Sequence, residues 1–109
     1  MLGVIAALSG AVAVIAGAFG AHAAKGDAVE WLKTGGHYQL IHAVAAILAL
    51  TVVRGNLAAA LFIAGGWVFG GSLYLMAAGA PRWFGAITPL GGLLLIAGWL
   101  ALGWTFLRR

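Results

Sequence analysis

Tyr38, Gln39 and His42 place three polar side chains at helical spacing inside an otherwise apolar run. Residues three and four positions apart share a helix face, so a helix through this stretch presents all three side chains together. Neutral imidazoles bind metals and haem iron, and a histidine beside tyrosine and glutamine can line a proton path or hold a quinone carbonyl. His22 joins this group only if the intervening segment folds back.

These residues do not complete a recognised catalytic or metal site. Two histidines form no metal signature, and the chain has no cysteine. Its only acidic residues, Asp27 and Glu30, lie outside the apolar runs in a helix-capping pattern, which argues against paired-carboxylate catalysis. The alternative is that the polar face ties helices together through hydrogen bonds, each contributing about 0.6 to 2 kcal/mol. We expect no catalytic and no metal-binding residues.

The composition predicts a membrane protein. The chain has 109 residues, of which 64 % are hydrophobic and 7 % are charged, and its mean hydropathy is +1.10. It therefore has too little polar surface to coat a water-soluble globule. A helical crossing takes about 20 apolar residues, so the length allows four crossings with short connections and no soluble domain.

The basic residues are scattered along the chain and do not form a patch, which argues against nucleic-acid binding and favours a role at the ends of membrane spans. They are Lys25, Lys33, Arg54, Arg82, Arg108 and Arg109.

We expect an all-α polytopic membrane protein, a compact bundle of four transmembrane helices in a single domain over residues 1–109. The predicted spans cover about residues 2–24, 34–53, 57–79 and 89–107. Between the first two spans, the charged segment 25–33 predicts a short interfacial helix, with Trp31 at the headgroup level.

A helical wheel divides the second span into two faces. Leu40, Ile41, Val44, Ile47 and Leu48 fall on the side expected to face lipid. The polar and small residues, among them Tyr38, Gln39, His42 and Ala46, fall on the side expected to pack against protein. His37 falls on the lipid side and is the weakest site candidate among the histidines.

Small residues also recur every seven positions, which predicts close helix packing along left-handed seams. The series are Gly3, Gly10, Gly17 and Ala24; Ala58, Gly65, Ser72 and Gly79; and Gly91, Gly98 and Thr105.

Several motifs in order along nearly the whole chain resemble the YgdD-like family of small inner-membrane proteins. They are Gly17-Ala18-Phe19-Gly20-Ala21-His22, Trp31 with Thr34-Gly35, Tyr38-Gln39 with His42, Gly71-Ser72-Leu73-Tyr74, Thr88-Pro89-Leu90-Gly91-Gly92 and Ala97-Gly98-Trp99. The resemblance implies four transmembrane helices in the bacterial cytoplasmic membrane and no established activity. It also implies that the residues on the family motif belong to one candidate polar cluster or ligand-binding site: His22, Tyr38, Gln39, His42, Ser72, Tyr74 and Thr88. The family pattern often has Phe-Ser-Gly-Ser where this chain has Gly70-Gly71-Ser72, which leaves open any hydroxyl role before the second glycine.

Three classes of function follow. The leading one is a structural or accessory membrane component in contact with lipid, as a homo-oligomer or as a subunit of a larger complex. The second is a small-molecule carrier or channel, and the third is a haem- or quinone-binding redox component that uses His22 and His42. The cofactor, if any, is not specified by the sequence. Arg54, Arg108 and Arg109 collect on one side without acidic neighbours, which together with the resemblance predicts that both termini are cytoplasmic.

Overall fold

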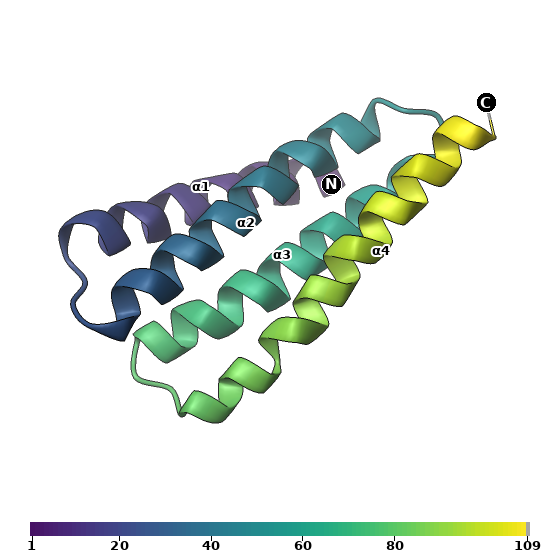
Figure 1. Ribbon diagram of the computed structural model, residues 1–109. Coiled ribbons are helices and arrows are strands. Elements are labelled where there is room, and N and C mark those ends of the chain that lie inside the picture. Colours follow the sequence, from purple (N-terminus) through teal and green to yellow (C-terminus); the bar gives the residue numbers. More distant parts are fainter. Residues whose placement is uncertain (109) are drawn as a thin grey trace.

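The computed structural model describes residues 1–108, and these residues form helices and no strand (Figure 1). Arg109, one of the basic residues predicted to lie at the ends of spans, is outside the described residues. The helices are α1 (Leu2–His22), α2 (Asp27–Leu50), α3 (Asn56–Ala77), the short 3-10 helix η1 (Arg82–Ala86) and α4 (Thr88–Leu107).

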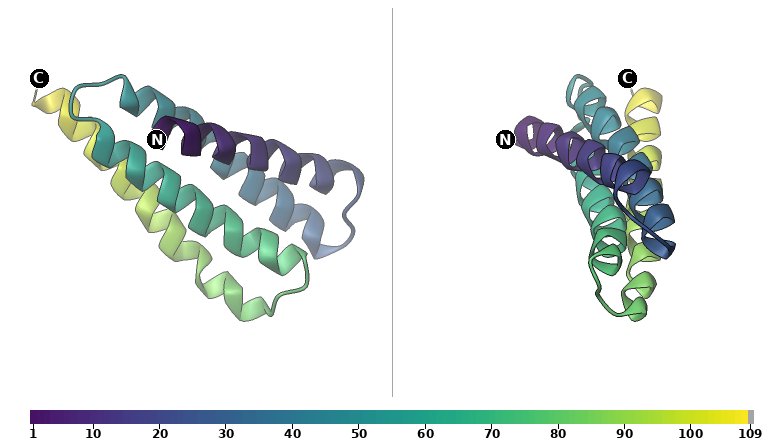
Figure 2. Two further views of the ribbon diagram at one scale, coloured as in Figure 1. Left: turned by 180° about the vertical axis from the view of Figure 1, so that it is seen from behind. Right: turned by 90° about the vertical axis from the view of Figure 1, so that its left-hand side faces the viewer.

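Consecutive helices run antiparallel, with α2 and α3 as the central pair. Helix α1 packs mainly on α2, and α4 packs on α3, so the bundle is elongated, with extents of 47 × 24 × 19 Å (Figure 2). The α1–α2 loop and the α3–α4 connection lie at one end, and the α2–α3 loop and the end of α4 lie at the other. This arrangement brings one face of α2 against its neighbours.

The start of α2 differs from the prediction. A separate interfacial helix was expected before residue 34, but α2 begins at Asp27 and continues without a break to Leu50. Gly35 and Gly36 do not end the helix, although glycine is a poor helix former. Both are buried, and a Cβ on Gly36 would lie 2.8 Å from the carbonyl oxygen of Ala13 in α1. Tertiary packing against the neighbouring helix thus offsets the local preference.

The predicted faces of α2 are confirmed. Gln39, His42 and Ala46 are buried. The aliphatic side chains expected to face lipid are exposed, from 40 % for Leu40 to 62 % for Val44. Tyr38 is the exception, because it is 44 % exposed at the edge of the interface.

The predicted lines of small residues match the observed helix contacts best between α3 and α4. Gly65, Ser72, Gly91 and Gly98 are buried there, and Phe62 lies fully buried opposite Gly98. In α1 the buried line is shifted from the predicted one and contains other residues: Ala6, Ser9, Ala13, Ala16 and Gly20.

Within residues 1–108, three segments are long and apolar enough to cross a membrane: Leu2–His22, Asn56–Ala77 and Arg82–Leu107. Helix α2 is not among them, since His37, Gln39 and His42 lower its mean hydropathy, in addition to the charged residues of its first turns. At that end Asp27 accepts a hydrogen bond from Arg82 at 2.5 Å, and the Arg82 guanidinium lies 5.3 Å from the ring centre of Trp31. Both charged side chains are mostly exposed, so the pair contributes little to stability.

Candidate functional site

Gln39 connects three helices through its side-chain amide. It is fully buried in α2. Its Nε2 donates to the Oγ of Ser9 in α1 at 3.0 Å, and its Oε1 accepts from the hydroxyl of Tyr74 in α3 at 2.7 Å. A buried amide without partners is costly in an apolar environment, so these two hydrogen bonds set how α1 and α3 rotate against α2.

The ring of Tyr74 reaches Gln39 because two glycines leave room for it. A Cβ on Gly35 of α2 would lie 2.7 Å from Cε1 of Tyr74, and a Cβ on Gly70 of α3 would lie 3.0 Å from its hydroxyl oxygen. Any larger residue at Gly35 would push the ring away from its present place. The glycines beside the polar residues are therefore part of the same arrangement.

His42 connects α2 to α4. Its Nδ1 lies 2.6 Å from the carbonyl oxygen of Tyr38, and its Nε2 lies 3.0 Å from the indole Nε1 of Trp99. A carbonyl only accepts and an indole N–H only donates, so the neutral ring carries its proton on Nδ1 and accepts at Nε2. Both ring nitrogens are thereby occupied. The rings of Phe62 and Trp99 enclose the imidazole at centroid distances of 5.6 and 5.8 Å.

Ser72 and Thr88 form a third contact, between α3 and the start of α4. The Ser72 hydroxyl donates to the carbonyl of Phe69 at 3.0 Å, so Thr88 is the donor in the 2.5 Å contact between the two hydroxyl oxygens. Thr88 is the first residue of α4, and its hydroxyl pairs with α3 and makes no capping hydrogen bond. The hydroxyl therefore joins two helices.

The predicted cluster is only partly assembled. Gln39 and Tyr74 are in direct contact, and His42 and the Ser72–Thr88 pair join α4 to the same bundle at other positions. Tyr38 contributes its carbonyl to His42 and packs its ring on Phe69 at 4.8 Å. His22 stands apart. It is exposed at the last residue of α1, whereas His42 lies about four turns, or about 22 Å, into α2.

Sequence reasoning missed two members of these contacts, Ser9 and Trp99. Ser9 is the only hydroxyl-bearing residue in residues 2–21, which is a signal that could have identified it. Trp99 is in the recognised motif, but nothing local to α4 indicates that its indole faces a histidine of α2. The partner of each residue becomes visible only when the helices are packed.

The arrangement offers hydrogen bonds between helices and little else chemically. Throughout residues 1–108, every buried side-chain nitrogen or oxygen has a hydrogen-bond partner. The same residues contain no group of three or more histidine, cysteine or acidic side chains placed to hold a metal ion. The polar side chains are thus engaged with one another.

We expect His42→Ala to lower the free energy of unfolding in detergent by about 1 to 3 kcal/mol, because it removes two hydrogen bonds and the ring contacts with Phe62 and Trp99. Trp99→Phe keeps an aromatic ring and removes only the indole donor, so its effect should be smaller. Titration with a denaturing detergent, followed by circular dichroism, measures both. Wild-type stability in His42→Ala would contradict a packing role.

Comparison with known proteins supports the resemblance noted in the sequence. Residues 16–92 match the family described as "Protein of unknown function (DUF423)". A "UPF0382 membrane protein" of Haemophilus influenzae is 38 % identical over 109 residues, covering 92 % of this chain and 88 % of the relative. SH2409, a "UPF0382 membrane protein" of Staphylococcus haemolyticus, is 39 % identical over 109 residues, covering 91 % and 88 %.

The "UPF0382 inner membrane protein YgdD" of Escherichia coli strain K12 is 40 % identical over 107 residues, covering 88 % of this chain and 81 % of the relative. No solved structure matches the chain. The matched residues 16–92 run from the second half of α1 to the start of α4 and include six of the polar contact residues and both glycines beside Tyr74: Gly35, Tyr38, Gln39, His42, Gly70, Ser72, Tyr74 and Thr88. Together these matches show that the chain belongs to the DUF423 family of UPF0382 membrane proteins.

Proposed function

We propose that this protein is a structural or accessory component of the bacterial cytoplasmic membrane, without enzymatic activity. The observation that carries the proposal is that its buried polar side chains satisfy one another across helix interfaces. Gln39, His42 and Ser72 each join two or more helices through hydrogen bonds. In lipid, where the hydrophobic effect does not drive helix association, such contacts and small-residue packing hold a bundle together.

The proposal includes four membrane crossings, with α2 as the fourth. From Thr34 onward α2 is uncharged, and its outward face is aliphatic. Its uncharged part, residues 34–50, extends over about 26 Å, at the short end of the lengths that cross a hydrocarbon layer, and the long side chain of Lys33 can reach the surface. Lying between α1 and α3, it shares their environment.

Both termini are assigned to the cytoplasm. The end of the bundle that holds Arg54 and Arg108 has no acidic side chain, whereas Asp27 and Glu30 lie at the other end with Lys25 and Lys33. Positive residues are enriched in cytoplasmic loops. The two ends hold equal numbers of basic residues, so the proposal follows the adjacent pair Arg108 and Arg109 at one end, together with the family resemblance.

The chain contains no cysteine, so single-cysteine variants test this orientation directly. We expect a membrane-impermeant maleimide to label Lys25→Cys in intact spheroplasts and to label Val53→Cys, in the 81 % exposed position of the α2–α3 loop, only after permeabilisation. The reverse pattern would invert the orientation. If both variants were labelled from the same side of the membrane, the two loops would lie on one side, and α2 would not cross the membrane.

The sequence leaves open a haem or quinone site at His22 and His42, and a carrier or channel along the polar face. The two histidines lie at different depths, and both nitrogens of His42 already have partners. A transport path needs polar groups open to water, whereas Gln39 is fully buried and Ser72 is nearly so. The geometry therefore supports the structural role over both alternatives.

The exposed surfaces of the bundle indicate which kinds of partner it can contact. The outer faces of all four helices expose aliphatic and aromatic side chains, which suits lipid contact, assembly with a second copy or docking to a larger membrane complex. The scattered cations do not suit nucleic acid.

Native mass spectrometry of the protein released from gently solubilised membranes, with its absorption spectrum, tests the functional proposal. We expect an oligomer or a complex without a visible absorption band. A haem, quinone or metal that is bound to the wild type and lost in His42→Ala would overturn it.

A further inference from the structure

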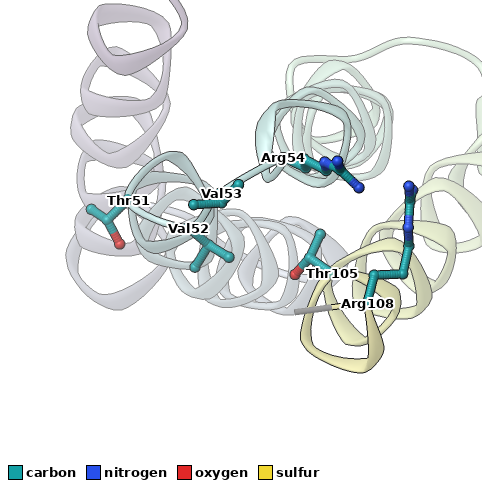
Figure 3. A pocket seen from close by; sticks show the side chains of 6 residues that line it. All are labelled: Thr51, Val52, Val53, Arg54, Thr105 and Arg108. Carbon is teal, nitrogen blue, oxygen red and sulfur yellow. The ribbon is translucent and has the colours of Figure 1, made fainter.

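Two arginines meet in a cavity at the end of the bundle assigned to the cytoplasm. The cavity has a volume of about 380 Å³ and lies between the α2–α3 loop and the last turn of α4. We call it the arginine pocket; its lining residues are Thr51, Val52, Val53, Arg54, Thr105 and Arg108. Figure 3 shows the side chains of Arg54 and Arg108 reaching from different elements with their guanidinium groups pointing toward one another.

A second cavity, of about 190 Å³, continues from the arginine pocket along α3 and α4. It shares Arg54, Thr105 and Arg108 with the first cavity. Its other lining residues are apolar or aromatic: Leu57, Ala58, Ala101 and Trp104. The site is thus charged at the end of the bundle and apolar toward its middle.

The two converging positive charges lack an acidic side chain to balance them. The chain has only two acidic side chains, and both Asp27 and Glu30 lie in the first turn of α2, at the other end of that helix from the α2–α3 loop. Arg108 packs its guanidinium 5.9 Å from the ring centre of Trp104, a contact that orients the side chain without neutralising it. Like charges that approach one another repel, so this arrangement favours an anion between them.

Arg54 also occupies an unfavourable backbone conformation. Its φ is 63°, in the left-handed region where a side chain clashes with the following carbonyl, and where glycine or asparagine is preferred. Gly55 and Asn56 follow immediately, yet arginine stands at the strained position. Strain of this kind gathers at sites where a side chain must be presented in a fixed direction.

We propose that the arginine pocket binds the phosphate of an anionic phospholipid headgroup, with an acyl chain along the apolar groove beside Leu57 and Ala101. Guanidinium groups bind phosphate oxygens in a bidentate manner, and they do so here at the helix ends, where headgroups lie. Anionic lipids are concentrated at the cytoplasmic surface, so this inference rests on the proposed orientation. The apolar continuation of the pocket favours a lipid over a free phosphate ion.

The test compares phosphatidylglycerol with phosphatidylcholine of the same acyl chains, added to the purified full-length protein in neutral detergent and followed by native mass spectrometry. We expect phosphatidylglycerol to bind at least tenfold more tightly. Arg54→Gln/Arg108→Gln should bind the two lipids equally. The control variant Lys25→Gln/Lys33→Gln removes two positive charges from the other end of the bundle. It should still bind phosphatidylglycerol more tightly than phosphatidylcholine.

Arg54→Gly separates binding from folding, because glycine relieves the backbone strain while it removes one guanidinium. It should remain at least as stable as the wild type and lose most of the preference for phosphatidylglycerol. Equal binding of both lipids by the wild type would overturn the proposal, as would an equal loss in the Lys25/Lys33 variant. The proposal would also be overturned if inorganic phosphate or glycerol phosphate displaced phosphatidylglycerol completely and bound as tightly as the lipid does. The pocket would then be a site for a soluble anion. The assay is carried out in detergent, so its result does not depend on how the protein is oriented in the membrane. The cysteine labelling described above tests the orientation separately.

Discussion

Gln39→Leu is expected to lower the free energy of unfolding in detergent by about 2 to 4 kcal/mol, one of the two largest effects of a single substitution in this chain. Leucine has nearly the same size, so the change acts mainly through hydrogen bonding. It removes the contacts to Ser9 and Tyr74, which leaves the buried hydroxyl of Ser9 and the half-buried hydroxyl of Tyr74 without this partner. Denaturing-detergent titration monitored by circular dichroism measures the change.

The partner substitutions provide the control for this prediction. Ser9→Ala and Tyr74→Phe each remove one hydrogen bond and no other polar group, so each should cost less than Gln39→Leu. Because Ser9 and Gln39 interact directly, the double variant Ser9→Ala/Gln39→Leu should lose less free energy of unfolding than the two single variants lose when added together. Strict additivity would mean that the two side chains do not stabilise each other.

Gly91→Ala should destabilise the protein by about 3 kcal/mol, because overpacking is costly where the opposing atoms cannot move. A Cβ on Gly91 would overlap the backbone nitrogen of Phe69 in α3. The two helices would have to separate, and the hydroxyl pair of Ser72 and Thr88 one turn away would be strained or lost. The same detergent titration measures this effect.

The next residue gives a matched control. A Cβ on Gly92 would lie 4.0 Å from a ring carbon of Phe69, an ordinary contact. Alanine also favours a helix over glycine by about 1 kcal/mol, so Gly92→Ala should be neutral or stabilising. If both variants lost the same stability, the effect would come from the helix itself and not from its close approach to α3.

Local pattern was a good guide wherever one helix could be considered alone. The faces of α2 followed from the positions of Gln39, His42 and the aliphatic residues, since a side chain's direction around a helix depends only on its place in the sequence. The same reasoning failed at the start of α2. The charged segment 25–33 suggested a separate interfacial helix, but α2 continues through it and through Gly35 and Gly36, where α1 and Tyr74 approach closely, and a single-helix pattern does not contain these neighbours.

The candidate site was recognised in part for the same reason. Gln39 and Tyr74 were both on the recognised motif, and the structure places them in contact. Ser9 lies outside the family motif, and the motif by itself gives Trp99 no partner. His22 was grouped with His42, although the antiparallel turn after α1 leaves it at the end of the bundle.

By itself, then, the sequence determined the apolar helical class of this protein, its four long helices in residues 1–108 and the exposed aliphatic side of α2, because composition and helical period are local properties. Only the tertiary structure decided which partners meet. The hydrogen-bonded pairs Ser9–Gln39, Gln39–Tyr74 and His42–Trp99 are separated by 30, 35 and 57 residues. Their contact depends on the rotation and depth of each helix against its neighbours. Helices this rich in glycine and alanine pack closely in more than one register, so the polar groups select the register only when they can reach one another.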